Sequence, residues 1–135
     1  MVEFIELPLP PSINRAFTFN PRIHALAHTR EATEYLTAAG WMVKGSCIEK
    51  NIRSIDSYCT VGLKFYLGRK NADSHNYKKL LFDALQKGGL FTDDRYIMDQ
   101  TLSVEIDSKN PRVKILLPSS KIKQMLSYQL PSDTT

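Results

Sequence analysis

The segment from Arg69 to Asp99 limits the possible folds of this chain more than any other stretch. Apolar residues recur over about residues 74–87 with the spacing of an amphipathic helix, at Tyr77, Leu80, Leu81, Ala84 and Leu85. Glycine ends helices and adopts positive φ at little cost, so the pair Gly88-Gly89 predicts a sharp reversal just after this helix. The helix and the turn behind it therefore have to pack on a core formed by the rest of the chain.

Aspartates lie at both ends of this predicted helix. Asp73 precedes it, and Asp93 and Asp94 follow the glycine turn. If the chain doubles back, a carboxylate before the helix and one after it can converge on one cation. Asp73 also follows a predicted strand, and side chains just beyond a strand end are held by rigid elements. The arrangement is a candidate divalent-metal site, although an aspartate before a helix is more often only an N-cap.

The remaining patterns predict four strands and a second helix. Alternating, strand-forming segments lie at residues 2–7, 58–66, 96–107 and 112–117, and the turn formers between the last two predict a hairpin. Residues 30–44 have helical periodicity, which can extend to Lys50. Residues 12–29 are expected to form an extended loop, either a surface excursion or a DNA-contacting arm. One small mixed sheet of about four strands with two main helices is an α+β fold.

The size and composition of the chain are those of one ordinary globular domain. With 135 residues, we expect a single domain over residues 1–126, ending in a short helix from Ser119 or Ser120, and a frayed tail over residues 127–135. The net charge of +4 permits a polyanionic partner without requiring one. Without a membrane-length apolar run or a signal-peptide pattern, we expect no membrane association, a cytoplasmic location, and Cys47 and Cys59 as reduced thiols.

The residue types around the helix suit phosphodiester hydrolysis. That reaction needs a source of hydroxide and positive charge near the phosphoryl oxygens, which Mg²⁺ held by two or three carboxylates can supply together with a lysine. Asp73, Asp94 and Lys79 provide those groups, with Asp93 or Asp99 as further candidates. Taken alone this is a modest indication, because any chain with 14 acidic residues offers a few such pairs.

Taken in order along the chain, several motifs resemble the RusA family of Holliday-junction resolvases, a group common in prophages. The matching segments are LPLPPSINR at residues 7–15, DSHN at 73–76, Lys79, FDAL at 82–85, Gly89, Asp93-Asp94 and Asp99. The resemblance implies a RusA-like fold and a homodimeric DNA endonuclease of recombination and repair that nicks two strands of a four-way junction symmetrically. It also implies that Asp73 and Asp94 bind Mg²⁺ and that Lys79 is needed for cleavage.

One position departs from the family pattern. The best-known form of the second motif is Asp-x-Asp-Asn, whereas this chain has Asp73-Ser74-His75-Asn76. Three roles are open for His75. It can bind the metal through a neutral ring nitrogen, which would favour Mn²⁺ relative to Mg²⁺. It can act as general base on the attacking water. Or the substitution marks a weakened site in a protein that only binds branched DNA.

Basic and amide side chains outside the acidic centre are candidates for DNA contacts, namely Asn14, Arg15, Arg69, Lys70, Asn76 and Lys79. A four-way junction has approximate two-fold symmetry, so an isologous dimer would supply two matched sites. The leading hypothesis is a junction-resolving nuclease in which Asp73, His75, Lys79 and Asp94 are catalytic and Asp73, His75 and Asp94 bind Mg²⁺, or Mn²⁺. The alternatives are a non-catalytic branched-DNA-binding protein descended from a resolvase, and a nuclease for flaps, forks or RNA.

Overall fold

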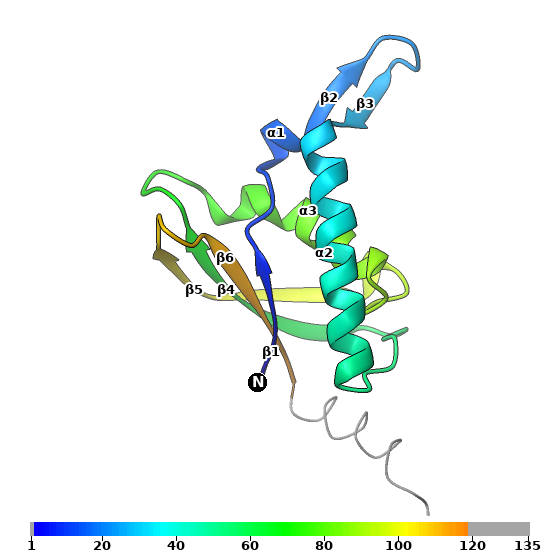
Figure 1. Ribbon diagram of the computed structural model, residues 1–135, viewed down its shortest axis with the longest axis vertical. Helices are drawn as coiled ribbons and strands as arrows, with labels where there is room; N and C mark the ends of the chain where they lie inside the picture. The colour runs from blue at the N-terminus through cyan, green and yellow to red at the C-terminus, as the bar shows by residue number, and fades with distance from the viewer. Residues whose placement is uncertain (1, 119–135) are drawn as a thin grey trace, which may run out of the picture.

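The computed structural model describes residues 2–118. It has one four-stranded sheet, helices that pack against it, and a projecting hairpin (Figure 1). Its strands are β1 (Val2–Pro8), β2 (Phe17–Asn20), β3 (Ala25–His28), β4 (Cys59–Leu67), β5 (Ile97–Ile106) and β6 (Arg112–Leu117). Its α-helices are α1 (Ile13–Ala16), α2 (Arg30–Glu49) and α3 (Lys78–Lys87). Two 3-10 turns, η1 (Ser74–Tyr77) and η2 (Asp94–Tyr96), flank α3. The α+β class, the four-stranded mixed sheet and the two main helices are confirmed.

The four strands are ordered β1-β6-β4-β5, which corrects one prediction. The expected hairpin between the last two strands is wrong, because β4 lies between β5 and β6. β4 pairs with β5 in parallel and with β6 antiparallel. Two neighbouring parallel strands need a crossover, and α3 with its flanking turns is that crossover. The chain then passes the end of β4, where the Asp107 amide donates to the Leu67 carbonyl at 2.8 Å, before returning as β6.

A single hydrophobic core lies between the sheet and the helices. On β4, alternate residues from Cys59 to Leu67 are buried, as a strand with one covered face requires. The predicted apolar face of the residue 74–87 segment is buried as expected: Tyr77, Leu80, Leu81, Ala84 and Leu85. α2 contributes a matching stripe that includes Leu36, Ala39 and Val43. α2 and α3 pack against each other within this core.

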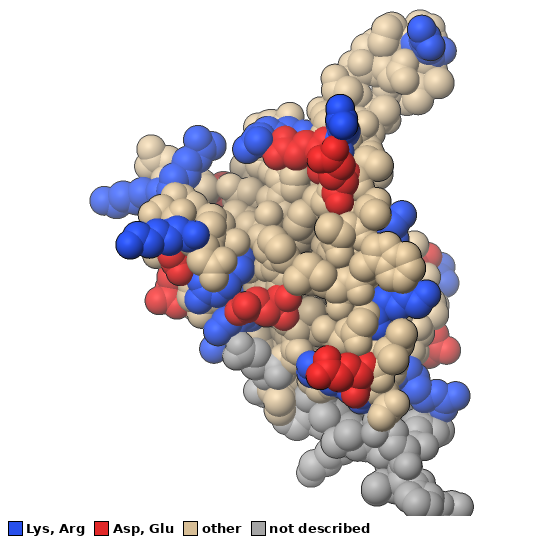
Figure 2. All heavy atoms as spheres, in the orientation of Figure 1, with Lys and Arg blue, Asp and Glu red and all other residues tan. Residues whose placement is uncertain are grey.

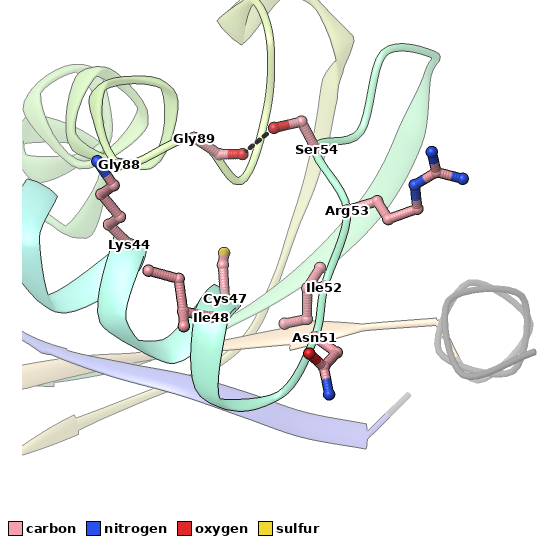
Figure 3. Close-up of a pocket in the computed structure, with 9 residues that line it drawn as sticks. All are labelled: Lys44, Cys47, Ile48, Asn51, Ile52, Arg53, Ser54, Gly88 and Gly89. Atoms are coloured by element: carbon pink, nitrogen blue, oxygen red, sulfur yellow. Dashed lines mark hydrogen bonds between the residues drawn. The ribbon is translucent and has the colours of Figure 1, made fainter. Parts of the chain in front are cut away.

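The glycine pair after α3 performs two different tasks. Gly89 has a φ of 88°, the left-handed conformation that the predicted reversal requires. Gly88 has an ordinary φ of −79°, but a Cβ there would lie 2.4 Å from the Val43 Cβ and 2.7 Å from the Gly40 carbonyl. Figure 3 shows both glycines beside the C-terminal half of α2, where the Ser54 hydroxyl donates to the Gly89 carbonyl. Gly88 therefore permits the close approach of α2 and α3.

The segment between β1 and α2 is ordered structure, so the predicted extended loop is wrong. α1 begins after Ser12, and β2 and β3 pair antiparallel as a separate two-stranded sheet. Phe17, Thr18 and Phe19 are strand formers, and Asn20-Pro21 favours a turn, so the hairpin has local sequence support. Figure 1 shows this hairpin projecting beyond the N-terminal end of α2.

Other expectations meet the structure only in part. Both cysteines are free thiols, as predicted. The expected C-terminal helix and frayed tail lie outside the described residues, 2–118. Within that described range, no helix combines the length and the apolar character needed to cross a lipid bilayer.

Candidate active site

An ion cluster lies on the exposed face of α3, opposite its buried stripe. Lys79 and Asp83 are one helical turn apart, and the Lys79 Nζ lies 3.0 Å from the Asp83 Oδ1. The same Nζ lies 3.8 Å from the Asp94 Oδ2, which comes from the other side of the glycine turn. A carboxylate on the helix and one beyond it therefore share one ammonium group.

The position of Asp94 follows from the reversal after α3. The Leu90 amide donates to the Leu85 carbonyl at 3.0 Å, which closes the turn. The Asp94 amide then donates to the Gln86 Oε1 at 2.9 Å, so the start of η2 is tied to the last turn of α3. Asp93 caps η2 by accepting from the Arg95 amide at 2.9 Å. Asp93 is thus a capping residue, and Asp94 is the one whose side chain reaches Lys79.

The electrostatics of the cluster keep Lys79 charged. Its hydrogen bond to Asp83, together with the charges of Asp83 and Asp94, raises the pKa of the Lys79 ammonium above its ordinary value. A raised lysine pKa means that the cation persists through neutral pH and is lost only in strong alkali. Lys79 can therefore offer positive charge and hydrogen bonds to a phosphate, and it cannot act as a base at neutral pH.

Two residues of this region were not among the predicted site residues, Asp83 and His28. The His28 Nε2 lies 3.9 Å from the Asp83 Oδ2, and the His28 ring packs on Phe17 with centroids 5.0 Å apart. The i, i+4 spacing from Lys79 could have indicated Asp83 from sequence. Nothing in the sequence spacing could have indicated His28, because it reaches Asp83 from the end of β3, 55 residues earlier in the chain.

Asp73 and His75 lie at the other end of the crossover segment. Asp73 is the N-cap of η1, and its Oδ1 accepts from the His75 amide at 3.0 Å. In the described part of the chain no hydrogen bond or ion pair joins either residue to Asp94, whose ion pair is with Lys79. Nor do residues 2–118 contain three or more His, Cys, Asp or Glu side chains placed to hold one metal ion. The structure therefore does not assemble the predicted ligand set Asp73, His75 and Asp94.

A second ion pair lies beside the cluster and accounts for another candidate carboxylate. The Lys78 Nζ is 2.8 Å from the Asp99 Oδ2, and the Lys78 side chain is largely shielded from solvent while that of Asp99 is partly covered. Asp99 lies on β5, so this pair joins the first turn of α3 to the edge strand of the sheet. Asp99 is thus engaged in a structural contact between the crossover helix and the strand that follows it.

The predicted DNA-contacting residues gather around the start of the crossover. Arg15 and Arg69 line one open hollow between α1 and the loop that follows β4. Arg15 is already paired there with Glu31, at 2.7 Å. Lys70 follows Arg69 in that loop, and Asn76 lies in η1, which α1 contacts. The structure therefore brings the N-terminal motif near the second motif, while Lys79 lies in the first turn of α3.

Comparison with known proteins supports this grouping of motifs. The family model described as Endodeoxyribonuclease RusA matches residues 8–117, which is most of the chain and nearly all of its described part. A search of curated protein sequences gave no significant match. The matched range begins at the proline-rich end of β1 and ends at the last residue of β6, so it includes α3, the glycine turn and Asp94. This chain belongs to the RusA family of endodeoxyribonucleases.

Proposed function

We propose that this protein is a structure-selective DNA endonuclease that resolves Holliday junctions by paired nicks, acting as a homodimer with a divalent metal ion, Mg²⁺ or Mn²⁺. The observation that carries the proposal is the exposed cluster on α3, in a chain whose family is that of the RusA endodeoxyribonucleases. A fixed ammonium beside two carboxylates offers the charges that phosphoryl transfer uses. A role in DNA recombination and repair follows if four-way junctions are its substrate.

Lys79 has the clearest chemical role in this proposal. Its side chain is about half exposed and its ammonium stays protonated at neutral pH, so it can donate to the non-bridging oxygens of a scissile phosphate. Negative charge on those oxygens is stabilised by a positioned donor, and removing one such donor commonly costs about a hundredfold to a thousandfold in rate. Asp83 positions this lysine by accepting a hydrogen bond from its ammonium, and His28 lies beside the other oxygen of the Asp83 carboxylate.

The metal part of the proposal depends on a predicted ligand set, the carboxylate oxygens of Asp73 and Asp94 and a ring nitrogen of His75. A divalent ion would supply Lewis acidity and an activated water when bound. In the described structure these three side chains are not grouped around one point.

The departure from the family pattern favours a second function, a branched-DNA-binding protein without cleavage. The chain has His75 where the family pattern has an aspartate, so an expected carboxylate is replaced by an imidazole. Such a protein would bind junctions tightly and in a salt-sensitive way. It would cut none in any divalent ion.

The decisive experiment compares cleavage and binding on the same substrates. A mobile four-way junction, a replication fork, a linear duplex and a hairpin RNA would be incubated in Mg²⁺, Mn²⁺ or EDTA, and binding would be measured by gel shift in EDTA. We expect paired nicks in the junction alone, with Mn²⁺ at least as effective as Mg²⁺ if His75 is a ligand. Junction binding without nicking in either ion would select the second function, and a strict Mg²⁺ requirement would remove His75 as a ligand.

Asp73→Asn separates the metal role of Asp73 from its capping role. Asparagine and aspartate are equally good N-caps, so the variant should keep the hydrogen bond from the His75 amide while losing the charge. We expect cleavage to be abolished and gel-shift affinity for the junction to remain. Full cleavage by this variant would show that Asp73 only caps η1.

Lys79→Gln tests the proposed role of the ammonium, with Lys87→Gln as the matched control on the same helix. We expect the cleavage rate to fall about a hundredfold or more in Lys79→Gln and to change little in the control. Lys79→Arg should recover part of the rate because it restores the charge. A Lys79→Gln variant that cleaves as fast as the control would contradict the assignment.

A further inference from the structure

The hairpin of β2 and β3 exposes apolar side chains where none is needed for the fold. Phe19 and Leu26 lie directly opposite each other in its register, and they are 58% and 68% exposed. Ile23, in the connecting turn, is 60% exposed. A two-stranded hairpin is marginally stable alone in water, and apolar side chains presented this way usually mark a surface that binds something.

The base of the hairpin is firmly attached to the body. The Thr29 amide donates to the Ala16 carbonyl at 2.9 Å, and the Thr29 hydroxyl donates to the Arg15 carbonyl at 2.7 Å. Thr29 is also the N-cap of α2, because its side chain accepts from the Ala32 amide. The turn is shaped locally as well, since Asn20 accepts from the Arg22 amide at 2.9 Å. The hairpin is therefore an arm of defined structure, and hydrogen bonds fix its base to the rest of the domain.

One face of this arm continues into the ion cluster on α3. Phe17 pairs with His28 and Phe19 pairs with Leu26, and residues two apart on a strand share a face. Phe17 and His28 are in ring contact at the base, and His28 reaches Asp83. A row of rings and apolar side chains thus leads from the outer part of the arm to Asp83. The other face carries Thr18, Asn20 and two alanines, which are small or polar.

The charge of the arm indicates what it binds. No Asp or Glu occurs between Glu6 and Glu31, and the hairpin itself carries Arg22 and two histidines. In Figure 2 the projecting arm has no acidic atoms in view and ends in a basic group. Single-stranded or unpaired nucleic acid complements such a surface. Its phosphates are attracted to positive charge, and its unpaired bases stack on aromatic side chains. The lack of carboxylates on the arm removes repulsion toward a phosphate backbone.

We propose that the β2–β3 arm binds unstacked nucleobases at the branch point of the DNA, with Phe19 as the stacking ring and Leu26 as the apolar contact beside it. This rests on the proposed function, since it assumes that branched DNA is the ligand. The face of the arm that would bind the branch leads to the ion cluster that contains Lys79. The outer end of this surface would then select branched DNA, and the inner end would cleave it.

The test uses the full-length protein and a four-way junction with 2-aminopurine at the crossover, in EDTA so that no strand is cut. The fluorescence of 2-aminopurine rises when the base leaves the stack. We expect the wild type to raise the fluorescence and Phe19→Ala to lose that rise, with junction affinity about tenfold to a hundredfold weaker. Phe19→Trp should retain both, because its ring can stack. Thr18→Ala, on the other face of the same strand, is the matched control and should behave as wild type.

Each alternative outcome has its own signature. Unchanged fluorescence and affinity in Phe19→Ala, with folding verified by circular dichroism, would overturn the proposal. So would a change in molecular mass by light scattering in the DNA-free Phe19→Ala variant, because the arm would then bind a second copy of this chain. Failure of the proposed nuclease function would leave the fluorescence rise intact and remove only cleavage. Failure of the arm proposal would leave cleavage intact, so the two are distinguishable.

Discussion

Replacing Gly88 with alanine should strongly destabilise the packing of α3 on α2. The new methyl carbon would lie 2.4 Å from the Val43 Cβ and 2.6 Å from its Cγ1. Carbon atoms in contact normally lie about 3.5–4.0 Å apart, so more than 1 Å of separation is missing. The obstacles cannot rotate away, because the Val43 Cβ and the Gly40 carbonyl oxygen, 2.7 Å distant, are fixed to the backbone of α2. The two helices themselves have to move apart.

The expected cost lies at the upper end of the usual range for overpacking. Extra methylenes in a packed core cost about 1–3 kcal/mol, and the rigid obstacles here favour about 3 kcal/mol. For a domain of this size, that would lower the thermal midpoint by roughly 10 °C. Gly88 itself has ordinary helical backbone angles, so the alanine would introduce no backbone strain that could confuse the comparison.

Gly45→Ala is the matched control, since it makes the same chemical change in α2. A Cβ at Gly45 would have no neighbour within 4 Å. Alanine is the better helix former by about 0.5–1 kcal/mol, so this variant should be slightly more stable than the wild type. Both variants would be unfolded in urea with far-ultraviolet circular dichroism as the probe. A Gly88→Ala variant within about 0.5 kcal/mol of wild type would show that the helices do not approach as closely as described.

Three further predictions concern other named contacts. The Tyr35 hydroxyl donates to the Pro8 carbonyl at 2.6 Å, so Tyr35→Phe should cost about 1 kcal/mol of unfolding free energy in the same urea assay, and no loss would contradict this contact. The hydrogen bond from Arg112 lowers the pKa of Asp107, so its stabilisation is present above the unfolded pKa and is lost as pH falls through the lowered one. Asp107→Asn should therefore lower the thermal midpoint at pH 7 but not in strong acid, and an equal deficit at both pH values would refute the linkage. Burial raises the pKa of the Cys47 thiol, so iodoacetamide should label native Cys47 far more slowly than the urea-unfolded chain at neutral pH, and equal rates would contradict its burial.

Helical periodicity predicted the parts of this fold that depend on local pattern. The buried face of α3, the start of α2 and the reversal at Gly89 all follow from residue spacing and from the conformational freedom of glycine. The role of Gly88 did not follow, because its reason is the distance to Val43 in another helix. The two adjacent glycines look alike in sequence, and only the packing distinguishes them.

Strand order was the main fold feature that sequence reasoning missed. Short turn formers between β5 and β6 suggested a hairpin, and hairpins are the usual outcome of such connections. β4 instead takes the central position, where its alternate residues from Cys59 to Leu67 are fully covered. A strand that is buried this well gains more in the middle of the sheet than at an edge, and this preference involves the whole core rather than any local segment.

The sequence indicated only some members of the ion cluster, because the other contacts are not local in the chain. Lys79 and Asp94 are in the same cluster, as the folding back of the chain at the glycine turn implies. Asp83 and His28 complete the cluster through contacts across the helix surface and from the hairpin. Asp73 instead shows the local role that aspartate most often has before a helix, that of a cap. Whether it also binds a metal ion stays a prediction.

The packing of α2 on α3 also determines the geometry of the ion cluster. Gly88 allows the end of α3 to touch α2, and the chain reverses immediately afterwards through Gly89. From there only the short path through the Leu90 and Phe91 positions leads to Asp94, and both of those side chains are fully buried. The Ile55 amide and carbonyl hold this returning segment through Leu90 and Thr92. The backbone position of Asp94 relative to α3 is therefore set in the core, where Leu90 and Phe91 are packed. A substitution that separates the two helices would move one carboxylate of the cluster relative to the ammonium, and it would alter the site without touching any residue in it.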